Sequence, residues 1–194
     1  MLDRMVPGYT FSVSPYFNNA APPGYATQTP SRFVGFNPDR AYTFAPVVGG
    51  LPAQVTAGAG APADTVIWLP YMSGWVTWTR AEGRPILTGQ MSGCWLARGI
   101  LNGQPVFLHI GTDNSNPENN NQVKNGLKIS RNTHALTVVS AFLPHAAVPG
   151  CGAIFAAQTS DNRFLAIGCT PDVKLPTLFT VKKVVEVKPG TLPF

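Results

Sequence analysis

Residues 94–110 of the chain read CWLARGILNGQPVFLHI, in which two apolar segments flank the dipeptide Asn102-Gly103. An Asn-Gly pair between hydrophobic segments is the strongest short-range signal for a two-residue hairpin turn. We therefore expect the two segments to run antiparallel. In such a hairpin Cys94, at the start of one strand, and His109, near the end of the other, lie at the same open end.

The rest of the chain carries similar signals. Short apolar or alternating segments are separated by turn residues, and the 194 residues include 19 Gly and 19 Pro, a composition that favours many short strands over long helices. The predicted fold is mainly β (α+β), a β-sandwich of mostly antiparallel strands with few peripheral helices. The expected strands cover residues 32–36, 41–45, 53–56, 65–69, 74–79, 84–91, 94–99, 105–110, 133–143, 151–158, 164–169 and 178–187.

Helical signals are weak. Residues 114–125 are polar, rich in Asn and contain Pro117, which is typical of a surface loop or the start of a weak helix. Residues 117–128 are the best helical candidate. No internal repeat or linker divides the chain, so we expect one domain over residues 1–194. Its Pro-rich segment 1–31 is expected to lie over the core as an extended N-terminal arm.

The charge pattern argues against a nucleic-acid partner. The net charge is +5, but the Lys and Arg residues are scattered, whereas a nucleic-acid-binding face would gather them. The one dense group, Lys182-Lys183, falls in an alternating segment and is expected to lie on an exposed strand face.

No apolar stretch approaches the ~20 residues that span a bilayer, and residues 1–13 do not have the pattern of a signal peptide. We expect a monomer.

The chain has three cysteines, an odd number that cannot form a closed disulfide framework. Cys151 and Cys169 can pair with each other or pack as small buried hydrophobes, and we favour packing. No cysteine or histidine pair has the spacing of a zinc site, so neither a metal nor a cofactor is expected.

The turn Ser92-Gly93-Cys94 sets a thiol beside the strand that carries His109. A thiol is nucleophilic as the thiolate, and a nearby imidazole is the usual base that generates one. We expect backbone N–H groups of Ser92, Gly93 and Cys94 to face a developing oxyanion, and Gly93 to adopt an unusual backbone angle. Thr88 or Asp113 is positioned to hold the imidazole ring.

Two choices remain open from the residues alone. His134 and His145 are alternative bases, although neither has a hairpin that brings it to Cys94. Trp95 either packs in the core or walls a substrate slot. With Asp113, it is a candidate substrate-binding residue.

Three segments of this region carry a further signal. They read WLPY at 68–71, Thr88 followed by MSGC at 91–94, and GQPVFLHI at 103–110. Together they resemble the family of glutamine deamidases that comprises Burkholderia lethal factor and the catalytic domains of the cytotoxic necrotizing factors. The resemblance is fainter around residues 176–180 and is not visible in residues 1–60.

The resemblance implies a fold like the necrotizing-factor catalytic domain, with Cys94 as nucleophile, His109 as general acid and base, and Thr88 as third catalytic residue. It implies a hydrolase that converts a protein glutamine into glutamate and releases ammonia. The chain is then expected to be a toxin-like bacterial effector, a virulence factor that is secreted or injected and acts in the cytosol of a target cell. Its partner is expected to be a protein with an exposed glutamine, of the GTPase or translation-factor helicase class or from a competing bacterium.

Two other functions fit the sequence. A cysteine amidohydrolase or transglutaminase that acts on another amide uses the same pair of residues. A non-enzymatic β-sandwich module for binding or structure, adhesin-like or phage-type, suits the high Gly and Pro content and the charged fraction of 12%.

Overall fold

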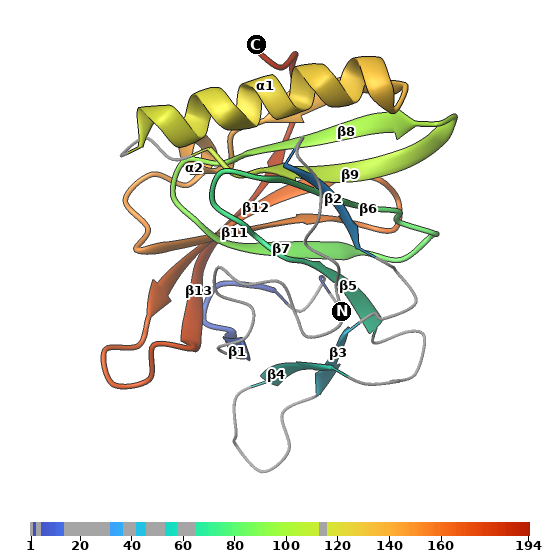
Figure 1. Cartoon of the computed structure of the whole chain (residues 1–194). Helices are drawn as coiled ribbons and strands as arrows, with labels where there is room; N and C mark the ends of the chain where they lie inside the picture. Colours follow the sequence, from blue (N-terminus) through green and yellow to red (C-terminus); the bar gives the residue numbers. More distant parts are fainter. Residues whose placement is uncertain are drawn as a thin grey trace.

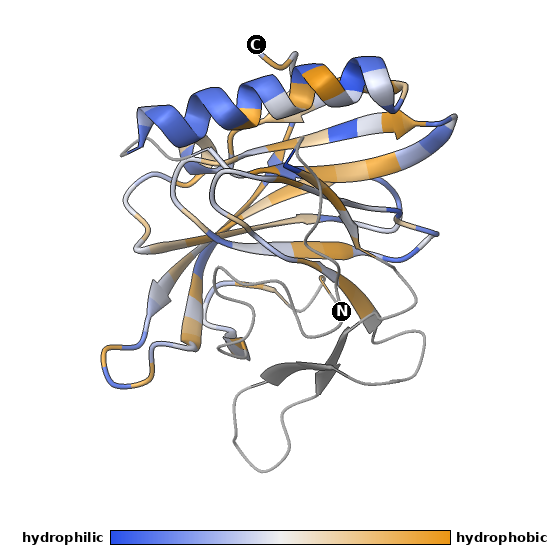
Figure 2. Ribbon diagram, viewed as in Figure 1, coloured by the Kyte–Doolittle hydropathy of each residue, from blue (hydrophilic) through white to orange (hydrophobic). Residues whose placement is uncertain are grey.

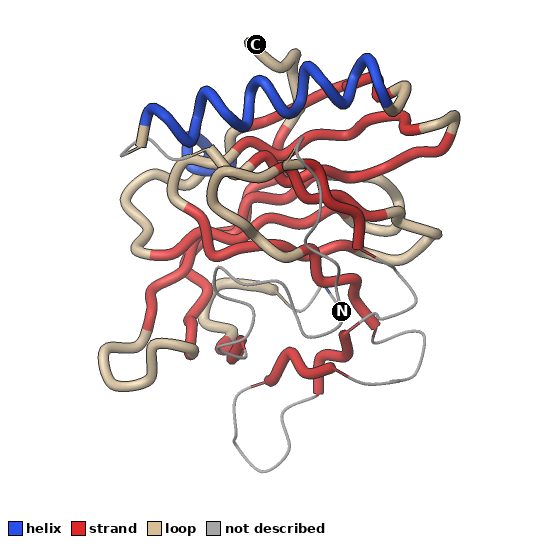
Figure 3. The backbone as a smooth tube through the Cα atoms, in the orientation of Figure 1, coloured by secondary structure: helices blue, strands red, loops and turns tan. Residues whose placement is uncertain are grey.

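The described residues of the computed structural model form two sheets and two helices, α1 (Pro117–Thr133) and α2 (Pro144–Ala147). Figures 1 and 3 show the sheets as stacked layers, with α1 lying across the outer face of the second sheet. The mainly β fold class predicted from the sequence is confirmed. The structure describes residues 2, 5–13, 32–36, 42–45, 53–57, 65–112 and 116–194.

The first sheet closes on itself into a barrel with the strand order β1-β13-β12-β11-β7-β5-β3-β4. Closure gives each of these strands two partners, which removes the exposed edges of an open sheet. Its strands are β1 (Thr10–Val13), β3 (Tyr42–Ala45), β4 (Ala53–Ala57), β5 (Thr65–Leu69), β7 (Ile86–Met91), β11 (Ala153–Gln158), β12 (Phe164–Pro171) and β13 (Leu178–Val187).

The second sheet has the order β10-β8-β9-β6-β2. The predicted hairpin joins β8 to β9: Asn102 and Gly103 have φ of 49° and 78°, the left-handed values of a type I′ turn. Most strand pairs are antiparallel, as predicted, while β1–β4, β2–β6 and β5–β7 are parallel. The strands of this sheet are β2 (Phe33–Phe36), β6 (Val76–Thr79), β8 (Trp95–Leu101), β9 (Gln104–Ile110) and β10 (Leu136–Phe142).

Apolar side chains form three packed layers. One cluster fills the barrel around Trp68 and Phe155. The second joins β7 of the barrel to β8 of the other sheet, for example through Ile86 and Leu96, and the third packs Leu108 and other residues of β8 and β9 against α1. Because successive side chains of a strand point to opposite faces, β8 and β9 contribute to both the second and the third layer. Figure 2 shows the hydrophobic colour gathered on the strands, with α1 largely hydrophilic.

The length of α1 is the largest departure from the sequence prediction, which placed a loop or weak helix here. The side chain of Asn116 accepts a hydrogen bond from the backbone N–H of Asn119 at 3.1 Å and so caps the first turn. The apolar side chains that α1 buries are those of Val123 and Leu127. Such a narrow buried stripe gives little helical periodicity in the sequence.

The N-terminal segment also differs from the expected arm. Residues 10–13 form β1, which lies in the barrel wall between β13 and β4. Phe11 and Val13 are fully buried in the barrel cluster, and the ring of Phe11 packs edge-on against Phe155 with 5.1 Å between centroids. The part of the expected arm at 14–31 lies outside the described residues.

We expect Phe11→Ala to lower the free energy of unfolding by about 3–5 kcal/mol, because it leaves a cavity among buried rings. Urea unfolding followed by tryptophan fluorescence measures the change. Val139→Ala is the surface control, since Val139 is 56% exposed, and its effect should stay within about 0.5 kcal/mol. A Phe11→Ala protein as stable as the wild type would show that β1 does not belong to the cooperative barrel.

Candidate active site

The predicted catalytic side chains lie in the layer between the two sheets, at the end where β7 passes into β8, and His109 Nε2 makes no hydrogen bond to the Cys94 thiol. Thr88 lies on β7, His109 lies on β9, and Cys94 lies in the turn that joins β7 to β8. Cys94 and Leu96 are two residues apart and share a face, and the strand register pairs Leu96 with His109. The thiol and the imidazole therefore lie on the same inward-facing side of the second sheet.

Thr88 holds the imidazole of His109 in one tautomer. Its Oγ1 lies 2.6 Å from the carbonyl oxygen of Leu69 and 2.6 Å from His109 Nδ1. A threonine hydroxyl has one proton, and a carbonyl only accepts, so the hydroxyl donates to Leu69 and accepts from Nδ1–H of His109. Nε2 is then the unprotonated nitrogen, as a general base requires.

His109 is deeply buried and neutral. Its exposed fraction is 1%, its ring stacks on that of Tyr71 with 5.1 Å between centroids, and Nε2 makes no hydrogen bond to the described residues. Burial lowers the pKa of His109 to about 3, because loss of solvent penalises the imidazolium. At neutral pH this ring takes up a proton only when a negative charge forms beside it.

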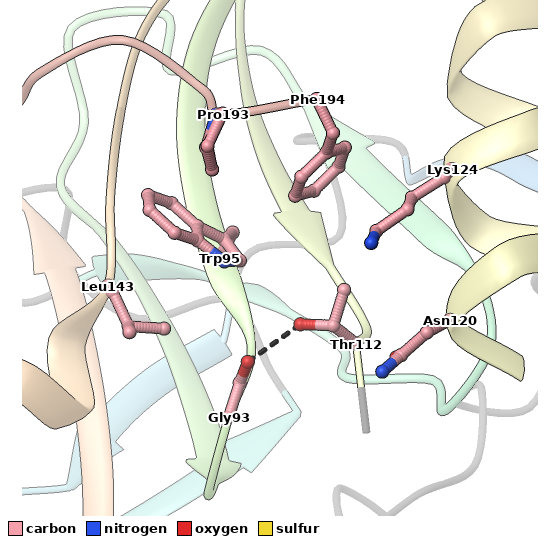
Figure 4. A pocket seen from close by; sticks show the side chains of 8 residues that line it. All are labelled: Gly93, Trp95, Thr112, Asn120, Lys124, Leu143, Pro193 and Phe194. Atoms are coloured by element: carbon pink, nitrogen blue, oxygen red, sulfur yellow. Dashed lines mark hydrogen bonds between the residues drawn. The ribbon is translucent and has the colours of Figure 1, made fainter. Parts of the chain in front are cut away.

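Cys94 is bonded to the end of β9 through Thr112. Its Sγ donates to the carbonyl oxygen of Thr112 at 3.5 Å, and Oγ1 of Thr112 donates to the carbonyl oxygen of Gly93 at 2.6 Å (Figure 4). We call these two hydrogen bonds the Thr112 clasp. The clasp fixes the turn that carries the thiol against the strand that carries the imidazole.

The predicted end of the hairpin does hold the pair, but it is closed, contrary to the expected open end. Cys94 is 2% exposed, and the loop between β5 and β6 places Tyr71 over the imidazole. Backbone hydrogen bonds fasten this loop to the chain after β9, from Gly74 N to Gly111 O at 2.9 Å and from Gly111 N to Trp75 O at 2.8 Å. A Cβ on Gly111 would collide with the carbonyl of Met72.

The turn residues differ from the sequence prediction in one respect. Ser92 is exposed and Gly93 is buried, but Gly93 has no positive φ, so the unusual backbone angle expected there is wrong. The left-handed backbone near the site belongs to Gly89, with φ of 147°, where a Cβ would collide with the ring of Phe155.

A pocket of roughly 330 Å³ opens on the α1 side of the turn (Figure 4). Trp95 lines it and also packs against the third apolar cluster, so core packing is present and the substrate-slot role stays a prediction. Because Trp95 and Leu96 are adjacent, their side chains point to opposite faces, and Trp95 points away from His109. The lining residues are Gly93, Trp95, Thr112, Asn120, Lys124, Leu143, Pro193 and Phe194.

The alternative bases lie elsewhere. His134 caps the C-terminal end of α1 and stacks on Phe33 with 5.7 Å between centroids, while His145 is exposed in α2. Of the three histidines, His109 is the one that shares a layer with Cys94. Asp113, the other candidate partner of the imidazole, lies outside the described residues.

The remaining cysteines pack without a disulfide, as favoured from the sequence. Cys169 is buried, and burial first and the neighbouring Cys151 second raise the pKa of the Cys169 thiol to about 12. Cys151 is half-buried. Lys182-Lys183 of β13 is exposed, as predicted.

Sequence reasoning missed two contacts of the site. Tyr71 was visible in the WLPY segment, yet a stacking contact between a loop and a distant strand leaves no spacing signal. Thr112 follows His109 by three residues, and its clasp to Gly93 joins chain segments 19 residues apart. A hydroxyl residue just past the end of an apolar strand is the only signal that could have indicated it.

No family model matches this chain, and no curated protein matches it either. None of the helices in the described part of the chain is long and apolar enough to cross a membrane. Within the same residues, no group of three or more His, Cys, Asp or Glu side chains could hold a metal ion. The functional conclusion therefore depends on the geometry of the site.

The buried imidazole predicts a pH dependence of stability. The unfolded chain binds a proton at His109 below about pH 6.5, whereas the folded protein does not until about pH 3. The free energy of unfolding that depends on the neutral state of His109 is therefore fully present above pH 6.5. It is lost as the pH falls toward 3, by up to about 1.4 kcal/mol per pH unit. Urea unfolding from pH 7.5 to 4 measures the slope.

His109→Gln should flatten this slope, and His145→Gln, at an exposed site, should keep it. The ring signals of His109 in the wild type should also show no titration by NMR between pH 8 and 5. A wild-type imidazole that titrates near 6.5 would contradict the buried, neutral state.

Proposed function

We propose that this chain is a cysteine-dependent amidohydrolase that converts a glutamine of a target protein into glutamate. The observation that supports this best is the bond from His109 Nδ1 to Thr88, which leaves Nε2 as a base on the face that carries Cys94. A buried histidine with its tautomer held by a hydroxyl, next to a cysteine, is the arrangement of nucleophilic catalysis. The same three residues are those that the resemblance to glutamine deamidases assigns.

The chemistry follows from the proton positions. His109 Nε2 removes the proton of the Cys94 thiol, and the thiolate attacks the carboxamide carbon of the glutamine. The imidazolium then protonates the departing nitrogen and the carbon–nitrogen bond breaks. Ammonia is released, and the glutamine acyl group stays on Cys94 as a thioester. Water, deprotonated by Nε2, attacks the thioester, and the products are glutamate and the regenerated thiol.

The donors for the oxyanion belong to the turn before the nucleophile. Backbone N–H groups of Ser92, Gly93 and Cys94 are the candidates, because the tetrahedral carbon forms at Sγ of Cys94 and its oxygen must meet fixed donors. The exposed position of Ser92 leaves one side of the turn open to an incoming side chain.

The resting site is closed, so attack requires local rearrangement. The Cys94 thiol must leave the carbonyl of Thr112 and turn toward Nε2, and the ring of Tyr71 must move to admit substrate. Catalytic hydrogen bonds are often long in the free enzyme and tighten only with substrate bound. A site that opens only for its substrate keeps other carboxamides away from the thiol.

The burial of Cys94 and His109 favours a glutamine side chain over a peptide bond. The carboxamide of glutamine lies at the tip of a slender stem, whereas a peptide carbonyl is flanked by chain on both sides and would not reach the Cys94 thiol. Water is also the smallest acceptor for the thioester, so hydrolysis is favoured over transfer to an amine. These points rank deamidation above proteolysis and transglutamination.

The resemblance alone supports the biological setting. We propose a toxin-like effector, acting as a monomer in the cytosol of a target cell, on a folded partner that exposes a glutamine. A GTPase and a translation-factor helicase are the partner classes that the resemblance suggests.

We expect Cys94→Ser to abolish ammonia release and Thr88→Val to lower kcat by about 100-fold or more, because the imidazole loses the acceptor that fixes its tautomer. Proteins of a cell lysate are incubated with each variant. The readouts are released ammonia and a mass gain of about one dalton at a glutamine, the difference between an amide and an acid.

Thr79→Val is the matched control for Thr88→Val. Thr79 is equally buried, and its hydroxyl donates to the carbonyl of Phe36 at 2.9 Å, away from the imidazole. The Thr79→Val protein should lose about 1–3 kcal/mol of its free energy of unfolding, because the carbonyl of Phe36 loses the hydroxyl that donates to it. It should retain activity. Ammonia release by Cys94→Ser, or equal losses in the two threonine variants, would refute the site assignment.

A non-enzymatic binding or structural module is the second candidate function, and the burial of the pair favours it. Cys94 and His109 are 2% and 1% exposed, as expected of packing residues. In that case the Thr88 hydroxyl only provides a hydrogen-bond acceptor for the buried Nδ1–H of His109. The reactivity of the thiols separates the two functions.

In the wild type we expect iodoacetamide to alkylate half-buried Cys151 before Cys94 and Cys169, because reaction requires an accessible thiolate. Tyr71→Ala uncovers the imidazole. If the site is catalytic, this variant should raise the Cys94 rate by at least about tenfold and keep it high at pH 6.5, where an ordinary thiol is protonated. Peptide mass mapping gives each rate, with Cys151 as internal reference. A Cys94 rate that rises only near pH 8.5 would support the binding module.

A further inference from the structure

The pocket on the α1 side of the turn shares its wall with the nucleophile. Gly93 precedes Cys94, Trp95 follows it, and the carbonyl of Thr112 accepts from its thiol. Both flanking residues line the pocket, whereas the Cys94 side chain lies on the opposite face of the strand. A group bound here is therefore one residue step away from the reacting sulfur, but does not itself reach it.

Two aromatic rings form one side of the pocket. Trp95 and Phe194 meet edge to face, with 6.3 Å between ring centroids, and the carbonyl oxygen of Phe194 accepts from the guanidinium of Arg131 at 3.3 Å. Gly190, a few residues before Phe194, pairs with Ala141 of β10. The ring of Phe194 is thus held in place by contacts along the chain that leads to it.

Lys124 supplies the charge of the pocket. Its Nζ lies 5.1 Å from the centroid of the Phe194 ring, and Figure 4 shows the ammonium beside that ring, with the Asn120 amide nearer to Thr112. No other lining side chain is charged, and no Asp or Glu side chain in the described part of the chain forms an ion pair with Lys124. An ammonium against aromatic walls attracts a carboxylate more strongly than one in open solvent does.

We propose that this pocket binds an aspartate or glutamate side chain that lies within two residues of the target glutamine. The rings of Trp95 and Phe194 would pack against its methylene stem, and Lys124 would pair with its carboxylate. An extended chain advances ~3.3–3.6 Å per residue, so an acidic side chain one or two residues from the glutamine lies within about 7 Å of it along the substrate chain. This inference rests on the proposed deamidase function and adds to it the sequence context of the substrate.

The test uses blocked tetrapeptides with one glutamine and, before or after it, a glutamate, a leucine or a lysine. For the wild type we expect kcat/KM to be at least about tenfold higher with glutamate than with lysine, as one ion pair in a partly enclosed pocket supplies. Lys124→Gln should remove this preference, and Lys124→Glu should reverse it. Lys128→Gln, exposed on the same helix outside the pocket, should keep the wild-type preference.

A binding measurement separates this proposal from the deamidase proposal. In the Cys94→Ser protein, the glutamate peptide should shift the indole N–H signal of Trp95 by NMR, and the lysine peptide should not. Binding of the glutamate peptide without deamidation of any peptide would uphold the pocket, whatever the outcome of the deamidase test on lysate proteins. Deamidation of all three peptides at equal kcat/KM, or a Lys124→Gln protein with unchanged preference, would overturn the pocket.

Discussion

The hydroxyl of Thr88 is the contact on which the candidate site depends. It joins the carbonyl of Leu69 in the barrel to the imidazole of His109 in the second sheet, across a mainly apolar layer. A buried imidazole is tolerated there because its Nδ1–H is paired. Nε2 has no described partner, and such a group costs about 1–3 kcal/mol. Local departures of this kind from stable packing are typical of functional sites.

Much of the fold follows from local sequence signals. The Asn102-Gly103 turn and the apolar segments around it predict the β8–β9 hairpin, and the other strands lie close to their expected positions. Closure of the first sheet into a barrel does not follow from local signals, because it depends on which strands pair and not on the alternation of residues within any one strand. The sequence underestimates the length of α1, because this helix buries few apolar side chains. It does not indicate β1, because four residues in a Pro-rich segment are too few to show a clear alternation of apolar and polar residues.

The site was predictable in its composition but not in its accessibility. The turn before Cys94 and the hairpin bring the thiol and His109 to one end, which spacing alone predicts. The hydrogen-bond direction at Thr88, the stacking of Tyr71 and the clasp from Thr112 come from contacts between distant segments. Such contacts decide whether a polar pair lies open or closed, and no local pattern encodes them.

The fastening of the β5–β6 loop to Gly111 limits how the pair can become exposed. Two main-chain bonds hold Gly74 and Trp75, which follow Tyr71, to the chain beyond β9, and Leu69, which precedes it, pairs with Thr88 in the barrel. The segment that bears Tyr71 is therefore anchored on both flanks and cannot lift away as a flap. Admission is then governed by rotation of one phenol ring about its own side-chain torsions. Such a rotation leaves the hydrogen-bonded strands of the scaffold intact.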